Sequence, residues 1–162
     1  MSILTYCSDH PIRSFAAGDV LLEEGRSGTE LYVLLEGKVA VMRGSVEVAR
    51  VKEPGALFGE MSVLLQSPYS ASVVAKSDVR AHHVADAGTF LSSSPAVALH
   101  CARLLAQRLQ DATTYLADFK AQFSDRTDHF GMVDEILDSL INQQWDEKAG
   151  GKQRGGAGDS RL

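Results

Sequence analysis

Residues 58–73 read FGEMSVLLQSPYSASV, and this stretch decides how the rest of the chain is interpreted. Gly59 and Glu60 open a short apolar segment that is typical of a single helical turn. Backbone N–H groups at the start of such a turn can face an anion, and the helix dipole favours negative charge there. Glu60 is then placed to accept hydrogen bonds from a sugar hydroxyl, while Ser70 and the N–H of Ala71 can close around a phosphate. A carboxylate for a sugar beside a cradle for a phosphate indicates a nucleotide site.

Around this stretch, short apolar runs separated by glycines predict β-strands. Glycine at the breaks supplies the positive φ that tight turns require, and Gly44-Ser45 between two alternating runs predicts a two-residue hairpin. Six or more short strands at this spacing predict a mainly β fold, either a compact barrel or a jelly roll. The runs with strand length and β-branched content are Val20–Glu23, Leu31–Leu35, Lys38–Arg43, Val46–Val51, Ser72–Ala75 and Val79–Val84.

After Asp86 the apolar residues recur with the period of a helix. Ser94 followed by Pro95 predicts a helix start, with serine as the cap and proline at the first helical position. A heptad seam then runs for about three and a half heptads, and its other faces are largely polar. A seam of this length favours a homodimer, and the alternative is an amphipathic helix that lies wholly on its own domain. The seam residues are Ala98, Ala102, Leu105, Leu109, Ala112, Leu116, Phe119 and Phe123.

The remaining residues divide into a second helix and a tail. An amphipathic pattern from Thr127 to Trp145 predicts another helix. From Lys148 to Leu162 the composition becomes glycine-rich, and a disordered tail is expected. The predicted organisation is a β domain with its N-terminal segment over 1–94, a long helix over 95–123, an additional helix over 124–147 and a tail over 148–162.

Composition limits the possible classes of protein. The 162 residues are enough for one domain with a real core, and the formal net charge of −5 argues against a nucleic-acid partner. No apolar run has the length of a membrane span, and the first twenty residues lack the pattern of a signal peptide. The two cysteines, Cys7 and Cys101, fit no metal-binding spacing and are expected to be reduced thiols in a cytoplasmic protein.

No catalytic or metal centre is predicted. His82 and His83 alternate between the two faces of a strand, so their rings cannot easily share one metal ion. Ser70 and Ser72 have no plausible base for nucleophilic work. The protein is therefore expected to be no enzyme and to require no cofactor.

The 58–73 stretch resembles the phosphate-binding cassette of the cyclic-nucleotide-binding domain family, whose pattern is roughly FGE(L/M)xL, a short spacer and PR(S/T)A(S/T)V. Residues 58–61 match its first half, and residues 68–73 match its second half at all positions but one. The segments 15–21 and 24–39 are similar to the opening strands of the family, so that the resemblance covers about residues 12–123. It implies a double-stranded β-helix, or jelly roll, flanked by helices. It also implies that the heptad helix mediates dimerisation, as in Crp/Fnr-type members.

The resemblance also implies a ligand and the residues that bind it. The ligand would be a cyclic nucleotide, cAMP or cGMP, and polar residues midway along the long helix would contact its base. The implied binding residues are Phe58, Gly59, Glu60, Met61, Ser62, Tyr69, Ser70, Ala71, Thr113 and Thr114.

One position departs from the family pattern. The arginine that clamps the cyclic phosphate falls on Tyr69. Tyrosine cannot supply a bidentate, charge-assisted contact, and losing one partner of a buried charge pair costs about 2–5 kcal/mol, or tens- to thousands-fold in affinity. Another cation could substitute, and the candidates are Arg26, Lys76 and Arg80.

Three functions therefore stay open. The leading one is a regulatory sensor module with weak or altered ligand specificity. The alternative is a ligand-free dimerising scaffold. The third is a relative of the Crp/Fnr-like transcription regulators, although residues after Phe123 offer one helix and a glycine-rich tail where a winged helix-turn-helix is expected.

Overall fold

The computed structural model describes residues 2–122 and 130–142. The chain divides into two compact units, Met1–His100 and Cys101–Leu162. The predictions for Phe123, for the flanks of the second helix and for the 148–162 tail fall outside the described residues.

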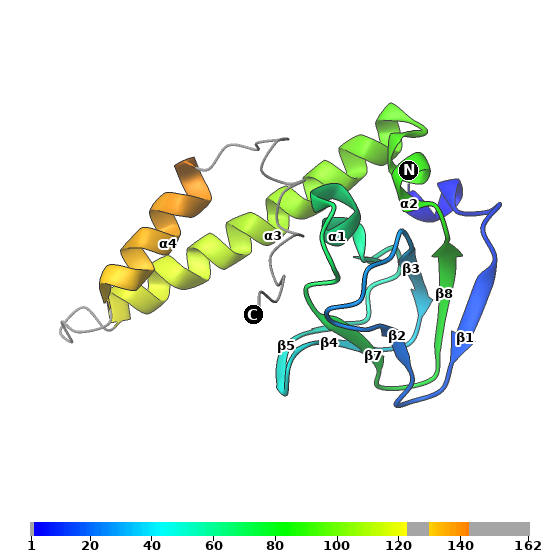
Figure 1. The fold of residues 1–162 in the computed structure, drawn as a ribbon, viewed down its shortest axis with the longest axis horizontal. Coiled ribbons are helices and arrows are strands. Elements are labelled where there is room, and N and C mark those ends of the chain that lie inside the picture. Colours follow the sequence, from blue (N-terminus) through cyan, green and yellow to red (C-terminus); the bar gives the residue numbers. More distant parts are fainter. Residues whose placement is uncertain (1, 123–129, 143–162) are drawn as a thin grey trace, which may run out of the picture. The chain divides into compact units, whose positions relative to one another are not determined.

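The first unit contains two four-stranded antiparallel sheets, which Figure 1 shows on the blue-to-green half of the chain. This arrangement confirms the predicted jelly roll with flanking helices. The first sheet has the order β1 (Ile12–Phe15), β8 (Val79–Val84), β3 (Leu31–Glu36) and β6 (Leu57–Phe58). The second sheet has the order β2 (Val20–Leu22), β7 (Ser72–Ala75), β4 (Val39–Arg43) and β5 (Val46–Val51).

The core of this unit lies between the inner faces of the two sheets. Cross-strand partners share a face, so the pairing of Tyr32 with His83 and of Leu34 with Ala81 places all four side chains on the inner face. Leu34 is fully buried. It belongs to one apolar cluster with Tyr32 of the same strand and with Val39 of the second sheet. Burial of this continuous apolar layer is the main contribution to the stability of the unit.

The predicted strand boundaries agree closely with the observed ones. Val46–Val51, Ser72–Ala75 and Val79–Val84 begin and end as expected. The hairpin prediction at Gly44-Ser45 is confirmed, because Arg43 pairs with Val46 and Gly44 has a φ of +58°. The strands β1 and β6 were not among the predicted apolar runs.

The first unit also contains three short helices. They are η1 (Ile3–Tyr6), α1 (Glu60–Leu65) and α2 (Ala87–Ser92). The long helix α3 (Pro95–Gln122) then begins at the predicted proline. Its cap is Ser94, whose hydroxyl accepts a hydrogen bond from the N–H of Ala96 at 3.2 Å, as the sequence indicated.

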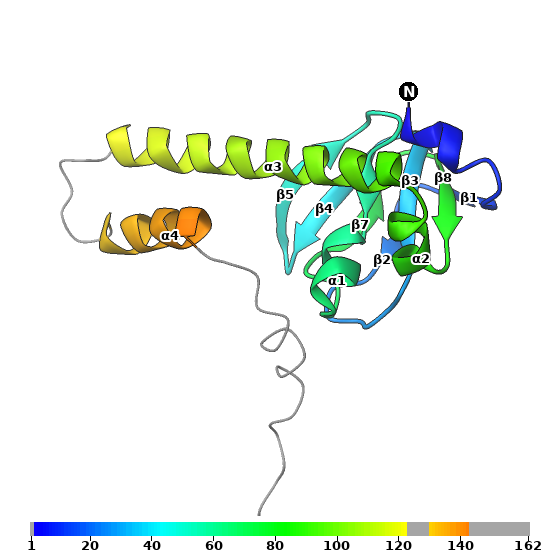
Figure 2. The same ribbon diagram turned by 90° about the horizontal axis from the view of Figure 1, so that it is seen from above.

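The second unit contains most of α3 together with α4 (Phe130–Asn142). Both views show α4 folded back beside the last turns of α3 (Figures 1 and 2), and an ion pair between Lys120 and Asp134 joins them. Along the predicted seam, Leu105 and Leu116 are half-buried, whereas Leu109 and Phe119 are exposed. No helix within the described part of the chain is long and apolar enough to cross a membrane.

Candidate ligand site

The 58–73 segment forms a strand, a sharp turn and one short helix. β6 ends at Phe58, and Gly59 follows with a φ of +99° as the N-cap of α1. A Cβ atom on Gly59 would lie 2.9 Å from the carbonyl oxygen of Glu30 and 3.1 Å from Leu22 Cδ1. This space is too small for any side chain. Glycine is therefore required here both by the backbone angle and by the close approach of the backbone at Glu30.

The helix α1 places alternate residues inside and outside the protein. Glu60 and Ser62 are buried, whereas Met61 is exposed. The hydroxyl of Ser62 donates to the carbonyl of Pro68 at 3.2 Å, and Gln66 ends the helix in the left-handed region with a φ of 52°. These contacts fold the segment back on itself, so that Ser62 in its first half bonds to Pro68 in its second half.

Tyr69 lies in the core of the first unit, with 5% of its surface exposed. Its hydroxyl donates to the carbonyl oxygen of Glu30 at 2.9 Å. The pKa of this hydroxyl is raised mainly because the group is buried, and to a lesser extent by the negative charge of Glu30. The ring also fills the space beside Gly28, where a Cβ atom would lie 2.4 Å from the tyrosine oxygen. The only proton that the phenol can donate is therefore used within the protein.

The loop between β2 and β3 runs alongside the second half of the segment. The N–H of Gly25 donates to the carbonyl of Tyr69 at 2.8 Å, and the N–H of Tyr69 donates to the carbonyl of Arg26 at 2.9 Å. The hydroxyl of Ser72 accepts from the N–H of Glu24 at 2.9 Å. The loop thus places Arg26, whose side chain is largely exposed and pairs with Glu23 at 3.0 Å, directly beside Tyr69.

The other two candidate cations lie elsewhere. Arg80 pairs with Glu36 at 3.2 Å, at the opposite end of the β3–β8 ladder from Glu30. Lys76 follows β7, and its N–H bonds to the carbonyl of Lys38 at 2.8 Å. Of the three candidates, Arg26 is therefore the one that the backbone hydrogen bonds bring to Tyr69.

The remaining predicted residues are placed as follows. Ser70 is exposed and Ala71 is half-buried, both just before β7. Phe58 is buried and pairs with Tyr32 in the first sheet. Thr113 and Thr114 lie on α3 in the second unit, so their contact with a base stays a prediction.

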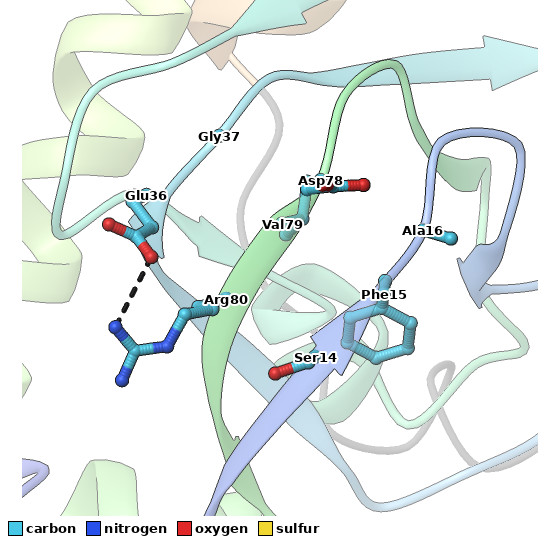
Figure 3. Close-up of a pocket in the computed structure, with 8 residues that line it drawn as sticks. All are labelled: Ser14, Phe15, Ala16, Glu36, Gly37, Asp78, Val79 and Arg80. Atoms are coloured by element: carbon cyan, nitrogen blue, oxygen red, sulfur yellow. Dashed lines mark hydrogen bonds and ion pairs between the residues drawn. The ribbon is translucent and has the colours of Figure 1, made fainter.

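An open hollow of ≈ 550 Å³ occurs at another part of the first unit. Figure 3 shows its lining, where the guanidinium of Arg80 faces the carboxylate of Glu36 and the ring of Phe15 lies across β8 from them. Because Glu36 and Arg80 pair at the far end of the β3–β8 ladder from Glu30, this hollow is separate from the 58–73 segment.

Sequence reasoning missed Glu30, which contacts the candidate site, and His83, which contacts Glu30. Glu30 accepts the hydroxyl of Tyr69 through its carbonyl, and its carboxylate accepts a hydrogen bond from Nε2 of His83 at 2.5 Å. His82, on the other face of β8, instead has its Nδ1 2.9 Å from the carbonyl of His10. The adjacent histidines were recognised as facing apart, but no sequence spacing connects His83 with a residue in the β2–β3 loop.

Comparison with known proteins assigns the domain. The cyclic nucleotide-binding domain family matches residues 12–88. Residues 12–88 of this chain form a domain of that family. The match contains both sheets and the whole 58–73 cassette, and it identifies the fold as that of the cyclic nucleotide-binding regulatory domains.

Individual relatives agree with this assignment. A cAMP-dependent protein kinase regulatory subunit of Hypocrea atroviridis is 41% identical over 68 residues, which are 42% of this chain and 14% of that protein. A CRP-like cAMP-activated global transcriptional regulator of Mycobacterium tuberculosis is 30% identical over 110 residues, which are 64% of this chain and 49% of that protein. The crystal structure of the Thermus thermophilus catabolite activator protein superposes with a TM-score of 0.62 at 31% identity, covering 73% of this chain and 58% of that one. The chain thus spans well under two-thirds of each of these relatives.

Proposed function

We propose that this chain is a regulatory module in which a cyclic nucleotide binds at the cassette and changes how the long helix α3 is held. The observation that carries the proposal is the construction of the cassette. Gly59 brings the start of α1 against the β2–β3 loop, Glu60 follows at the first helical position, and the hydroxyl of Ser62 donates to the carbonyl of Pro68, two residues before Ser70. We assign the sugar to Glu60 and the phosphate to the backbone around Ser70 and Ala71.

We further propose that recognition of the phosphate is altered. By resemblance, Tyr69 stands where the family carries its clamping arginine, and its hydroxyl proton is already donated to the carbonyl of Glu30. Arg26 is the cation that we assign to the phosphate, because its backbone pairs with Tyr69 and its side chain is exposed. A flexible, solvated arginine holds a phosphate less tightly than a buried one, so we expect affinity in the high micromolar to millimolar range.

We also propose that two copies associate through α3 and that the module works without a catalytic step. The exposed seam residues Leu109 and Phe119 support the dimer. For ligand binding to control the dimer, the ligand must favour one of two arrangements of α3 over the other. Both cysteines are buried free thiols, which accords with a cytoplasmic location.

Calorimetry and thermal melting with cAMP and cGMP on the whole chain test the ligand. We expect measurable heat and a rise in melting temperature at millimolar ligand, since a ligand that binds only the folded state stabilises it by an amount that grows with the ratio of ligand concentration to Kd. Arg26→Gln should weaken binding about tenfold. The matched control is Arg50→Gln, because Arg50 is also an exposed arginine in an ion pair with a glutamate three residues away. No heat and no thermal shift with either nucleotide would leave the dimerising scaffold as the function.

A further inference from the structure

One short segment of the β2–β3 loop contacts both halves of the cassette. The carbonyl oxygen of Glu30 accepts the hydroxyl of Tyr69 at 2.9 Å, and a Cβ atom on Gly59 would lie 2.9 Å from the same oxygen. The position of a single backbone carbonyl therefore sets both how deep Gly59 lies and where the ring of Tyr69 is held.

The side chain of Glu30 is fixed by β8. Its carboxylate accepts a hydrogen bond from Nε2 of His83 at 2.5 Å, and the side chain of His83 is 9% exposed. The imidazole packs against the ring of Tyr32, its cross-strand partner, with 5.1 Å between ring centroids. A buried ring with a packed face and a committed nitrogen has little freedom, so it provides a rigid anchor for the carboxylate.

The residue before Glu30 is tied to the same strand end. The hydroxyl of Thr29 donates to the carbonyl of Ala85 at 3.0 Å, and the N–H of Ala87 donates to the carbonyl of Thr29 at 2.8 Å. Ala85 and Ala87 flank the cap of α2, so the Thr29–Glu30 pair of residues joins the cassette to the connection between β8 and α2.

We propose that Glu30 and His83 form a positioning pair for the cassette. His83 holds the carboxylate of Glu30, and the backbone of Glu30 then holds Tyr69 and Gly59 in the arrangement that receives the cyclic nucleotide. The part of this inference that concerns ligand affinity rests on the proposed function. The part that concerns the coupling of His83 to Tyr69 does not.

A double-mutant cycle without ligand tests the coupling. Tyr69→Phe removes the bond to the Glu30 carbonyl and should lower the melting temperature by about 2–4 °C in the otherwise unchanged chain. In a His83→Phe background, where the side chain at position 83 has no donor for the Glu30 carboxylate, the same change should lower it by less than half as much. Equal decrements in both backgrounds would overturn the proposal, because independent sites are additive.

Conservative variants separate positioning from simple loss of packing. Glu30→Gln keeps an acceptor oxygen for Nε2–H of His83, so it should retain most of the coupling to Tyr69. Glu30→Ala should abolish the coupling. If the two variants gave the same coupling, the carboxylate would have no positioning role.

Ligand titrations complete the test and use the adjacent histidine as the matched control. His83→Phe should raise the Kd for cAMP or cGMP about tenfold, which is within the range of coupling energies between linked residues. His82→Phe removes an imidazole from the same strand but from its other face, and should change the Kd less than about twofold. An unchanged Kd in His83→Phe would overturn the proposal. Should the unaltered chain bind neither nucleotide, the proposed function fails, and the ligand-free cycle still decides whether the pair positions the cassette.

Discussion

The two units of this protein bury their apolar side chains to very different extents. In the first unit, Leu31, Val33 and Leu34 on β3 are 0% exposed. In the second unit, Phe119 on α3 is 40% exposed and Ile141 on α4 is 71% exposed. The first unit buries its apolar side chains within itself, whereas the helices of the second unit present apolar faces of the kind that a partner helix covers.

The difference explains why the two units were predicted from different sequence signals. Short alternating runs identify strands that close on themselves in two sheets. A heptad seam identifies a helix whose apolar face has to meet another helix, in this chain or in a second copy. If the two units differ in this way, a substitution in the seam should change association between two copies, and a substitution in the jelly roll should change the stability of the first unit.

The largest expected effect is on association. Leu109→Asp places a carboxylate in the middle of the seam, and a symmetric dimer would bury two of them without partners. We expect the dissociation constant of the dimer to rise at least about a thousandfold, measured by sedimentation velocity, with little change in the melting of the first unit. Gln110→Asp is the control on a polar face, and it should leave association unchanged. A chain that is monomeric before any substitution would show that the seam has no second copy as its partner.

The next effect is on the core of the first unit. Leu57→Ala removes a fully buried side chain and should lower the free energy of unfolding by about 2–5 kcal/mol in urea denaturation. The matched control is Leu64→Ala on α1, where 44% of the leucine is exposed and the loss should be about 0.5 kcal/mol or less. Similar losses for the two leucines would contradict the burial that distinguishes the jelly roll.

A smaller effect separates the two constraints on the cassette glycine. Gly59 and Gly18 have φ values of +99° and +95°, but a Cβ atom on Gly18 meets nothing within 4 Å. Gly18→Ala should cost about 1–2 kcal/mol from backbone strain alone. Gly59→Ala should cost clearly more, because it also forces the Glu30 carbonyl away. Equal costs would mean that the β2–β3 loop moves freely and does not hold the cassette.

The smallest effect concerns pH and the start of α2. Asp86 accepts hydrogen bonds from the N–H and the hydroxyl of Thr89, which lower the pKa of its carboxyl. Because the folded pKa lies below the unfolded one, the stabilisation is complete above the ordinary range of an aspartate, about pH 4, and is lost as the pH falls through the folded value. Asp86→Asn keeps an acceptor and does not titrate, so this part of the fall in melting temperature should disappear. An identical acid profile for Asp86→Asn would contradict the role of the cap.

Much of the first unit could be predicted from the sequence because its signals are local. Glycine breaks and β-branched runs located six strands, and the Gly59-Glu60 pair located the turn before α1. The strand β6 was missed because Leu57–Phe58 is two residues long and shows no alternation. The strand β1 was missed because its burial pattern is mostly exposed, so no apolar period marks it.

The candidate site was predicted less completely, since its contacts are distant in sequence. Tyr69 and Glu30 are 39 residues apart, and Glu30 and His83 are 53 apart. No spacing rule connects such positions. The pairing of β3 with β8 brings Glu30 to His83, and the hydrogen bonds of the β2–β3 loop bring it to Tyr69. The sequence could place Tyr69 in the cassette, but it could not indicate that the hydroxyl is committed to a neighbouring backbone carbonyl.

The packing of Tyr69 on Gly28 makes the residue tolerated at each of the two positions depend on the other. With tyrosine at position 69, a Cβ atom at position 28 would lie 2.4 Å from the phenol oxygen, so a larger residue at 28 would force the tyrosine ring to shift. The hydrogen bond from the phenol to the carbonyl of Glu30 would be disturbed by that shift. The effects of substitutions at positions 28 and 69 should therefore not be additive.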